Sequence, residues 1–283
     1  MTIHSTSAPS APGSASGAGF GSGCGLLVVG HGTADPVGAD ETRAVAAALA
    51  ELLPSVPVEL GFLEVIGPSI DDALRRLADR GCRDVVAAPL LLFAAGHAKR
   101  DVPEALDAAA RASGQRVVQA EPLGCHADVL AVSRERRRQA VAGLPAVAAS
   151  ATDLLVVGRG SSDPEALRQL GEFAEGTLAG DAARPRRLLL AFVAAARPSL
   201  DEAVEEACDP AAGDVRRILV QPHLLFRGHV EQQVAAAVAR GRAARPDVEW
   251  VQVPRLGPDR LVARALASRA AAARARESMS RQG

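Results

Sequence analysis

The chain has 283 residues, which is enough for two domains of ordinary size, and 48% of them are hydrophobic, as in a globular protein. Its formal net charge of −1 leaves no overall basic field of the kind that attracts nucleic acid. No apolar run approaches the roughly 18 residues that a membrane-spanning helix needs. Composition therefore predicts a soluble, cytoplasmic protein without nucleic-acid or membrane partners.

Four widely spaced cysteines, Cys24, Cys82, Cys125 and Cys208, form no CxxC pair. Neither a disulfide framework nor a structural zinc site fits this spacing, so we expect reduced thiols. Residues 1–24 precede the first apolar run and are rich in Ser, Ala, Gly and Pro. They lack the basic start and apolar core of a signal peptide, and we expect a disordered leader.

Apolar runs of strand length then alternate with helix-patterned segments rich in Ala, Leu, Arg and Glu. Continuous Val and Leu runs indicate strands that are buried on both faces, as in a parallel sheet covered by helices. The expected strands are Leu26–Gly30, Val58–Glu64, Asp84–Leu92 and Arg116–Ala120, and the expected helices are Gly38–Leu53, Ser69–Arg80, Ala98–Ser113 and Ala127–Gly143.

The second half repeats the first. Leu26–Pro36 returns as Leu154–Pro164, and three further landmarks recur in the same order. The repeat predicts an α/β fold of two tandem duplicated domains, each a mostly parallel sheet with helices on both faces. We place the domains at residues 25–143 and 144–272, with a tail at 273–283. The expected elements of the second half are strands Asp153–Gly158, Arg187–Val193, Val215–Gln221 and Val248–Val253, and a last helix near Asp259–Arg276.

Three residues of the first half follow or end predicted strands: His31, Glu64 and His97. In parallel α/β sheets the carboxyl ends of the strands form the ligand-binding edge. Two imidazoles and a carboxylate at one edge could bind a divalent cation such as Fe, Co, Ni or Zn. The same residues could move protons, because the ordinary pKa of histidine is about 6.5.

The equivalent positions of the second half hold Arg159, Ala194 and His229, so only one of the three side chains is kept. A purely structural role would have let both copies keep or lose the three residues together. The difference predicts one working site, in the first half.

The motifs Gly30-His31-Gly32-Thr33, Phe62-Leu63-Glu64, Pro89–Phe93 and Gly96-His97 resemble the signature of the sirohydrochlorin chelatase family. Each motif is short, but the ordered and duplicated set is specific, and the resemblance extends from Leu26 to about Ala270. It implies a chelatase-like fold and ATP-independent insertion of Fe²⁺ or Co²⁺ into sirohydrochlorin, toward sirohaem or cobalamin. It also implies no prosthetic group, with the divalent metal as a substrate.

The resemblance makes His31, Glu64 and His97 the catalytic and metal-handling residues. Imidazole can accept a pyrrole proton or bind the metal, and a carboxylate can orient it or complete the coordination. Because the substrate carries several carboxylates, cationic side chains should surround it. The candidates for substrate binding are Lys99, Arg100, Arg159, Arg197 and Arg227.

Other basic residues have simpler interpretations. We expect His126 to cap or precede a helix, His223 to be a satisfied core histidine, and the arginines of residues 264–276 to form the solvated face of an Ala-rich helix. Since the internal duplication can mimic a homodimer within one chain, we expect a monomer.

Three other functions share single features with this sequence. A non-catalytic metal or tetrapyrrole carrier could use the same three residues, and only turnover separates it from an enzyme. A histidine phosphatase would need Arg immediately before the His-Gly pair, where this chain has Gly30. A nucleotide-binding protein would need a GxGxxG or GxxxxGK[ST] turn between a strand and a helix, and none is present.

Overall fold

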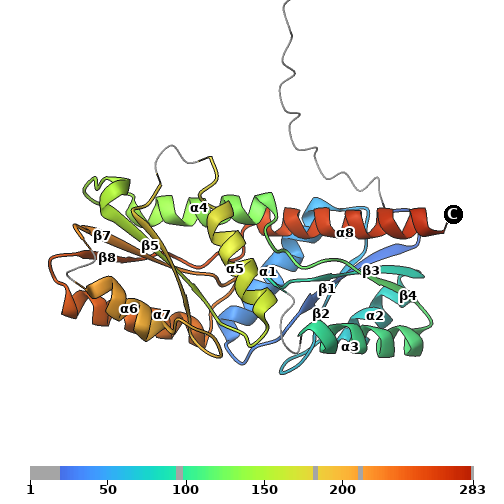
Figure 1. Cartoon of the computed structure of the whole chain (residues 1–283). Helices are drawn as coiled ribbons and strands as arrows, with labels where there is room; N and C mark the ends of the chain where they lie inside the picture. The colour runs from blue at the N-terminus through green and yellow to red at the C-terminus, as the bar shows by residue number, and fades with distance from the viewer. Residues whose placement is uncertain (1–19, 94–97, 181–183, 210–212, 282–283) are drawn as a thin grey trace, which may run out of the picture.

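The computed structural model describes residues 20–93, 98–180, 184–209 and 213–281. Its strands form two four-stranded sheets of orders β2-β1-β3-β4 and β6-β5-β7-β8, and every pairing is parallel. Helices cover both faces of each sheet (Figure 1). The predicted fold class, two duplicated parallel α/β units, is therefore confirmed. The strands are β1 Cys24–Gly30, β2 Val58–Phe62, β3 Asp84–Pro89, β4 Arg116–Gln119, β5 Thr152–Gly158, β6 Arg187–Phe192, β7 Arg217–Pro222 and β8 Glu249–Gln252.

The helices alternate with these strands, and the described residues of each half form four α-helices. Several begin at a side-chain cap: Asp35 and Asp163 accept backbone N–H groups at the starts of α1 and α5, each directly before a proline. The helices are α1 Pro36–Leu52, α2 Ile70–Asp79, α3 Ala98–Ser113, α4 Ala127–Val141, α5 Pro164–Gly176, α6 Leu200–Cys208, α7 His229–Ala244 and α8 Arg260–Ser280, with a short 3₁₀ helix, η2, at Ala149–Ala151.

Two of the expected bounds differ from the observed elements. The leader was expected to include Cys24, which instead opens β1, and Phe20 packs against the first core. Residues 1–19 lie outside the described part. The tail was expected from residue 273, but α8 continues to Ser280 and buries Ala273.

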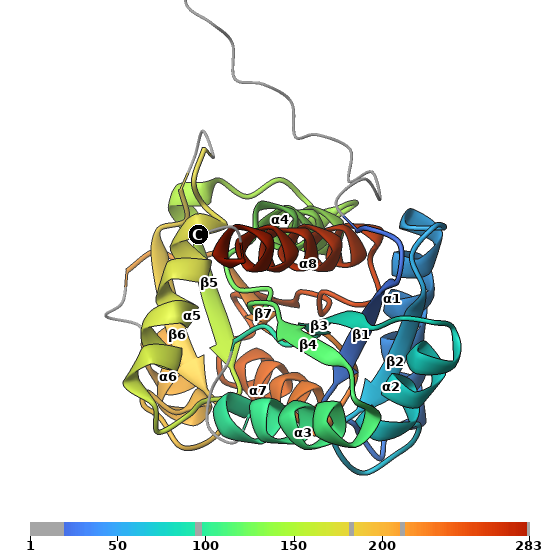
Figure 2. The same ribbon diagram turned by 90° about the vertical axis from the view of Figure 1, so that its right-hand side faces the viewer.

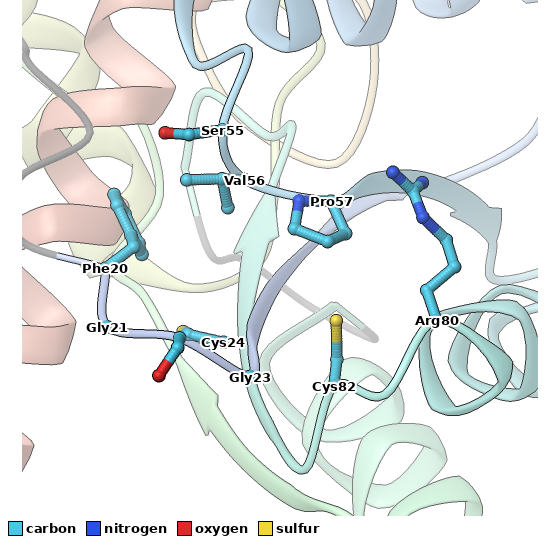
Figure 3. A pocket seen from close by; sticks show the side chains of 10 residues that line it. Phe20, Gly21, Gly23, Cys24, Ser55, Val56, Pro57, Arg80 and Cys82 are labelled. Carbon is cyan, nitrogen blue, oxygen red and sulfur yellow. The ribbon is translucent and has the colours of Figure 1, made fainter.

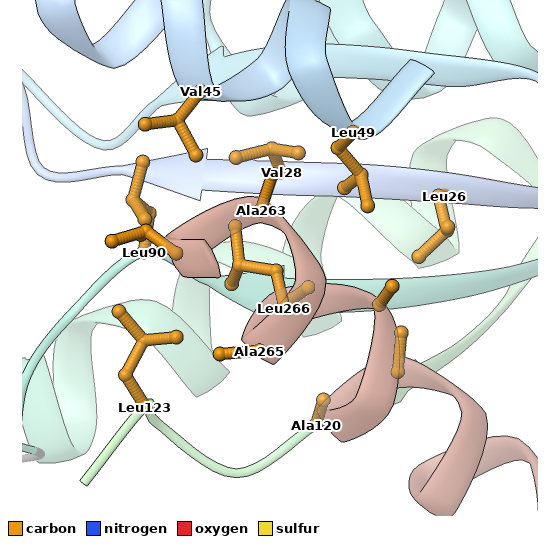
Figure 4. Packing of buried hydrophobic residues seen from close by; sticks show 14 of the residues in the cluster. Leu26, Val28, Val45, Leu49, Leu90, Ala120, Leu123, Ala263, Ala265 and Leu266 are labelled. Carbon is orange, nitrogen blue, oxygen red and sulfur yellow. The ribbon is translucent and has the colours of Figure 1, made fainter. Parts of the chain in front are cut away.

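The two halves exchange their last helices. Helix α8 belongs to the second half by sequence, but it packs beside α1 on the first sheet, against β3 and β4. Figure 4 shows Ala263, Ala265 and Leu266 of α8 facing Val28 of β1 and Leu90 in the same core. The small alanine side chains let the helix approach the sheet closely, so α8 completes the core of the other half.

Helix α4 makes the reciprocal contact with the second half. The buried Arg137 guanidinium donates to the Thr177 hydroxyl and the Gln221 side-chain oxygen, both at 2.9 Å, and Gln221 Nε2 donates to Ser133 Oγ at 2.6 Å. Helices α4 and α8 lie side by side along the same side of the molecule (Figures 1 and 2). The exchange ties the two halves into one structure.

The arginines of α8 correct the expectation of a solvated face. Arg264 forms an ion pair with Asp128 of α4, and Arg269 donates to the Leu123 carbonyl at 3.0 Å. Arg274 is mostly buried and lies 3.6 Å from Asp84 at the start of β3. Arg264, Arg269 and Arg274 therefore anchor the exchanged helix, whereas Arg276 is exposed as expected.

His126 does cap α4, since its Nδ1 accepts the Asp128 backbone N–H at 3.2 Å. His223 is in the core as expected, but it is not satisfied. Neither ring nitrogen has a hydrogen-bond partner among the described residues, and the ring lies between Phe93 and Phe173 at centroid distances of 4.9 and 4.1 Å. Burial lowers the pKa of His223 to about 3.

Replacing His223 by leucine, the residue at the equivalent position 90, is expected to stabilise the protein by about 1–2 kcal/mol, because a buried polar group without a partner is removed. The stability of this variant should also depend less on acid pH than that of the parent. Between pH 6.5 and pH 3, His223 is protonated in the unfolded chain but neutral in the folded protein. Its contribution therefore lowers the free energy of unfolding as the pH falls. From pH 7 to pH 5 the His223 contribution is about 2 kcal/mol.

Urea unfolding of both proteins at pH 7 and pH 5 measures both effects. A variant that is less stable at pH 7, or as acid-sensitive as the parent, would show that His223 has a stabilising partner.

Candidate metal centre

The pairing of β1 with β2 brings His31 and Glu64 together. Gly30 lies opposite Phe62, and the ladder continues past both strands: Leu63 N–H donates to the Gly30 carbonyl at 2.9 Å, and Glu64 N–H donates to the His31 carbonyl at 3.1 Å. Their side chains meet, with His31 Nε2 3.1 Å from Glu64 Oε1. Two of the three predicted residues are therefore adjacent at the carboxyl edge of the first sheet.

Gly32 makes this approach possible. Its φ of +100° lies in the left-handed region, and a Cβ at this position would lie 1.9 Å from the Glu64 carbonyl oxygen. Any other residue would push the two segments apart. The glycine of the Gly-His-Gly motif therefore sets the contact between His31 and Glu64.

The geometry of the pair suits a shared cation. Two ligands bound at about 2.1 Å lie about 3.0 Å apart at a right angle and about 3.4 Å apart in a tetrahedron, and the observed separation of the two donor atoms is 3.1 Å. The side chains are 42% and 58% exposed, so an incoming ion can reach them. Within the described ranges no group of three His, Cys, Asp or Glu side chains could hold a metal.

His97, the third predicted residue, lies outside the described residues. The strand order leaves its assignment as a prediction: β1 is central, β2 and β3 flank it, and the segment that contains His97 connects β3 to α3.

The second half repeats the backbone of this site without its chemistry. Ala194 N–H donates to the Arg159 carbonyl at 2.9 Å, and Gly160 has a φ of +92° with its Cβ position 1.7 Å from the Ala194 carbonyl oxygen. Arg159 and Ala194 replace the imidazole and the carboxylate, and His229 opens α7 as an exposed residue. The same turn therefore follows the first strand of each sheet. The imidazole and carboxylate of the His31–Glu64 pair lie in the first half.

Two of the predicted substrate-binding side chains, Lys99 and Arg227, form ion pairs with the opposite half. Lys99 Nζ donates to Asp163 Oδ2 at 2.8 Å, and Arg227 Nε lies 3.2 Å from Asp35 Oδ2. The hydrogen bond raises the pKa of Lys99 and lowers that of Asp163. Because Lys99 and Arg227 lie beyond β3 and β7, and the aspartates beyond β5 and β1, the two sheets face each other with their carboxyl ends.

The other three predicted cations differ in their surroundings. Arg197 is paired with Glu202, whereas Arg100 and Arg159 are exposed and have no ion pair within the part of the chain that the structure describes. Sequence reasoning missed Asp35 and Asp163 as partners of cations. The repeated Asp-Pro pair is the signal that could have indicated them as helix caps.

A separate cavity of about 370 Å³ lies at the opposite, amino-terminal edge of the first sheet (Figure 3). Cys24, Pro57, Arg80 and Cys82 contribute to its lining. Burial raises the pKa of both thiols. This cavity is not part of the His31–Glu64 site.

Comparison with known proteins agrees with the fold. The CbiX family model matches residues 25–140 and 153–273, which is one match for each half. A sirohydrochlorin cobaltochelatase of Priestia megaterium is 27% identical over 80% of this chain and 72% of its own. A sirohydrochlorin ferrochelatase of the same organism is 31% identical over 74% of this chain and 76% of its own.

A solved structure, SirB from Bacillus subtilis with Fe³⁺, superimposes with a TM-score of 0.78 and 25% identity, and covers 90% of this chain and 97% of that one. The chain is thus a duplicated chelatase-type α/β protein. It belongs to the CbiX family. No helix among the described residues is both long and apolar enough to cross a membrane.

Proposed function

We propose that this protein inserts a divalent metal, Fe²⁺ or Co²⁺, into sirohydrochlorin without ATP. The observation that carries the proposal is the His31–Glu64 pair, 3.1 Å apart and open to solvent in a chain whose relatives are named for this reaction. Both metals suit imidazole and carboxylate ligands, so the donor set is compatible with either.

His31 and Glu64 are the proposed metal-handling residues, with His97 as the third. Delivery of an ion needs an incomplete and exchangeable set of ligands, because a closed cage of four would retain it. Metallation also removes two pyrrole protons, and the neutral imidazoles of His31 and His97 can accept one each, while the Glu64 carboxylate stabilises the adjacent His31 cation. The exposed pair supports both roles in one place.

The cations Lys99, Arg100, Arg159, Arg197 and Arg227 are the proposed binding groups for the carboxylates of the macrocycle. Arg100 and Arg159 are the strongest of the set, because both are exposed and have no competing ion pair among the described residues. To bind the substrate, Lys99 and Arg227 would have to break their ion pairs with Asp163 and Asp35.

Anaerobic incubation with sirohydrochlorin and Fe²⁺ or Co²⁺, followed by absorbance, tests the function. We expect metallation well above the spontaneous rate, and its loss in a His31→Ala/His97→Ala double variant. A carrier would instead bind cobalt or the macrocycle and release no metallated product, which would overturn the enzymatic proposal.

We also infer a cytoplasmic monomer. The four cysteines are free thiols, as expected in a reducing compartment, and the exchanged helices give each half the covering that a second copy would otherwise supply. Sedimentation of the full chain should give the mass of one 29.1 kDa protein.

A further inference from the structure

Val65 combines two features that a soluble protein normally avoids. Its φ is +70°, in the left-handed region that is least favourable for a β-branched residue. It is also 63% exposed, so burial within the protein does not offset the strain. A single exposed valine needs no explanation, but a strained one does.

The turn around Val65 is held from both sides. Ile66 N–H donates to the Glu64 carbonyl at 2.8 Å, across Val65, which is the hydrogen bond of a γ-turn. Glu64 itself is fixed by its N–H bond to the His31 carbonyl and by the close approach of Gly32. The valine side chain is therefore displayed at a fixed place immediately beside the His31–Glu64 pair.

The second half shows that the turn does not require valine. Ala195 occupies the equivalent position with a φ of +56°, follows Ala194, and is also exposed. The two halves thus share the unusual backbone, and the half with the donor pair carries the bulkier and more strained side chain. The other exposed large apolar residues among those described are Val37, Leu144 and Met279, none of which has a positive φ.

We propose that Val65 is a positioning residue that packs against the apolar face of the tetrapyrrole and sets its place over the His31–Glu64 pair. This inference rests on the proposed function, which brings a flat, largely apolar ring to this edge of the sheet. The ring would cover the exposed isopropyl group, so that the strain of the turn is offset only when the macrocycle is bound.

The test compares Val65→Gly and Val65→Ala with Ala195→Gly. Glycine relieves the backbone strain and removes the side chain, whereas alanine reproduces the residue of the second half. For both Val65 variants we expect the Kd and KM for metal-free sirohydrochlorin to rise about tenfold, the value for loss of one buried valine contact. Co²⁺ affinity should stay within about twofold of the parent, and stability in urea should be equal or higher. Ala195→Gly should change neither Kd nor KM.

Macrocycle affinity that is unchanged in both Val65 variants would overturn the proposal. So would a parallel loss of Co²⁺ affinity, because that would indicate collapse of the turn. Failure of the proposed function is a separate result: the unmodified protein would not metallate sirohydrochlorin above the spontaneous rate, while fluorescence titration would still measure the effect of Val65 on macrocycle binding.

Discussion

A His31→Ala variant is expected to lose at least about 100-fold in the rate of metal insertion, because it loses the proposed metal ligand and proton acceptor. His31 is 42% exposed and follows β1 as a surface residue of the carboxyl edge, so its removal should leave the fold intact. The measurement is the steady-state rate of metallation under anaerobic conditions, together with urea unfolding of the same preparation.

His229→Ala is the matched control. This residue is also an exposed histidine, it lies at the repeat position of His97, and it opens α7 in the half where Ala194 replaces Glu64. We expect it to retain most of the activity. If His229→Ala were as inactive as His31→Ala, the second half would take part in the chemistry, and the interpretation of a single site would be wrong.

A Gly32→Ala variant is expected to lose about 2–4 kcal/mol of stability, and the residual folded protein should lose metal insertion as well. Alanine would have to adopt a φ near +100° and place its Cβ 1.9 Å from the Glu64 carbonyl oxygen. The chain can relieve this clash only by moving His31 away from Glu64. Urea unfolding measures the first effect, and the rate per folded molecule measures the second.

Gly160→Ala separates these two effects. Its φ is +92° and its Cβ would lie 1.7 Å from the Ala194 carbonyl oxygen, so its cost in stability should be similar. The clash occurs in the turn that carries no donor pair but does carry Arg159, so the KM for sirohydrochlorin should rise while kcat per folded molecule stays close to that of the parent. Equal loss of kcat in both glycine variants would mean that activity depends on the general integrity of the fold.

The order of strands and helices could be predicted because the buried strands are continuous apolar runs and the motif order repeats. β1 and β5 are buried along their whole length, and both were expected within two residues of their observed ends. The exchange of α4 and α8 could not be predicted. Periodicity shows that a helix such as Arg260–Ser280 has an apolar face, but not which of two similar sheets this face will cover.

The His31–Glu64 contact could be predicted from topology, because parallel strands end at one edge. The partners of the cations could not. Lys99 and Arg227 are paired with Asp163 and Asp35 of the opposite half, and these contacts depend on how the two sheets face each other. The lack of a partner for His223 among the described residues could not be predicted either. The sequence does not show whether a buried histidine is hydrogen-bonded.

The most direct test of the central claim is the rate of sirohydrochlorin metallation by a Glu64→Ala variant, which gives the first half the residue that Ala194 supplies in the second. Because the Glu64 side chain is 58% exposed and its backbone carries the pairing with His31, the fold should persist. We expect metal insertion to fall to a few per cent of the parent rate or less, while unfolding in urea is unchanged. An unaltered rate in the folded variant would contradict the claim.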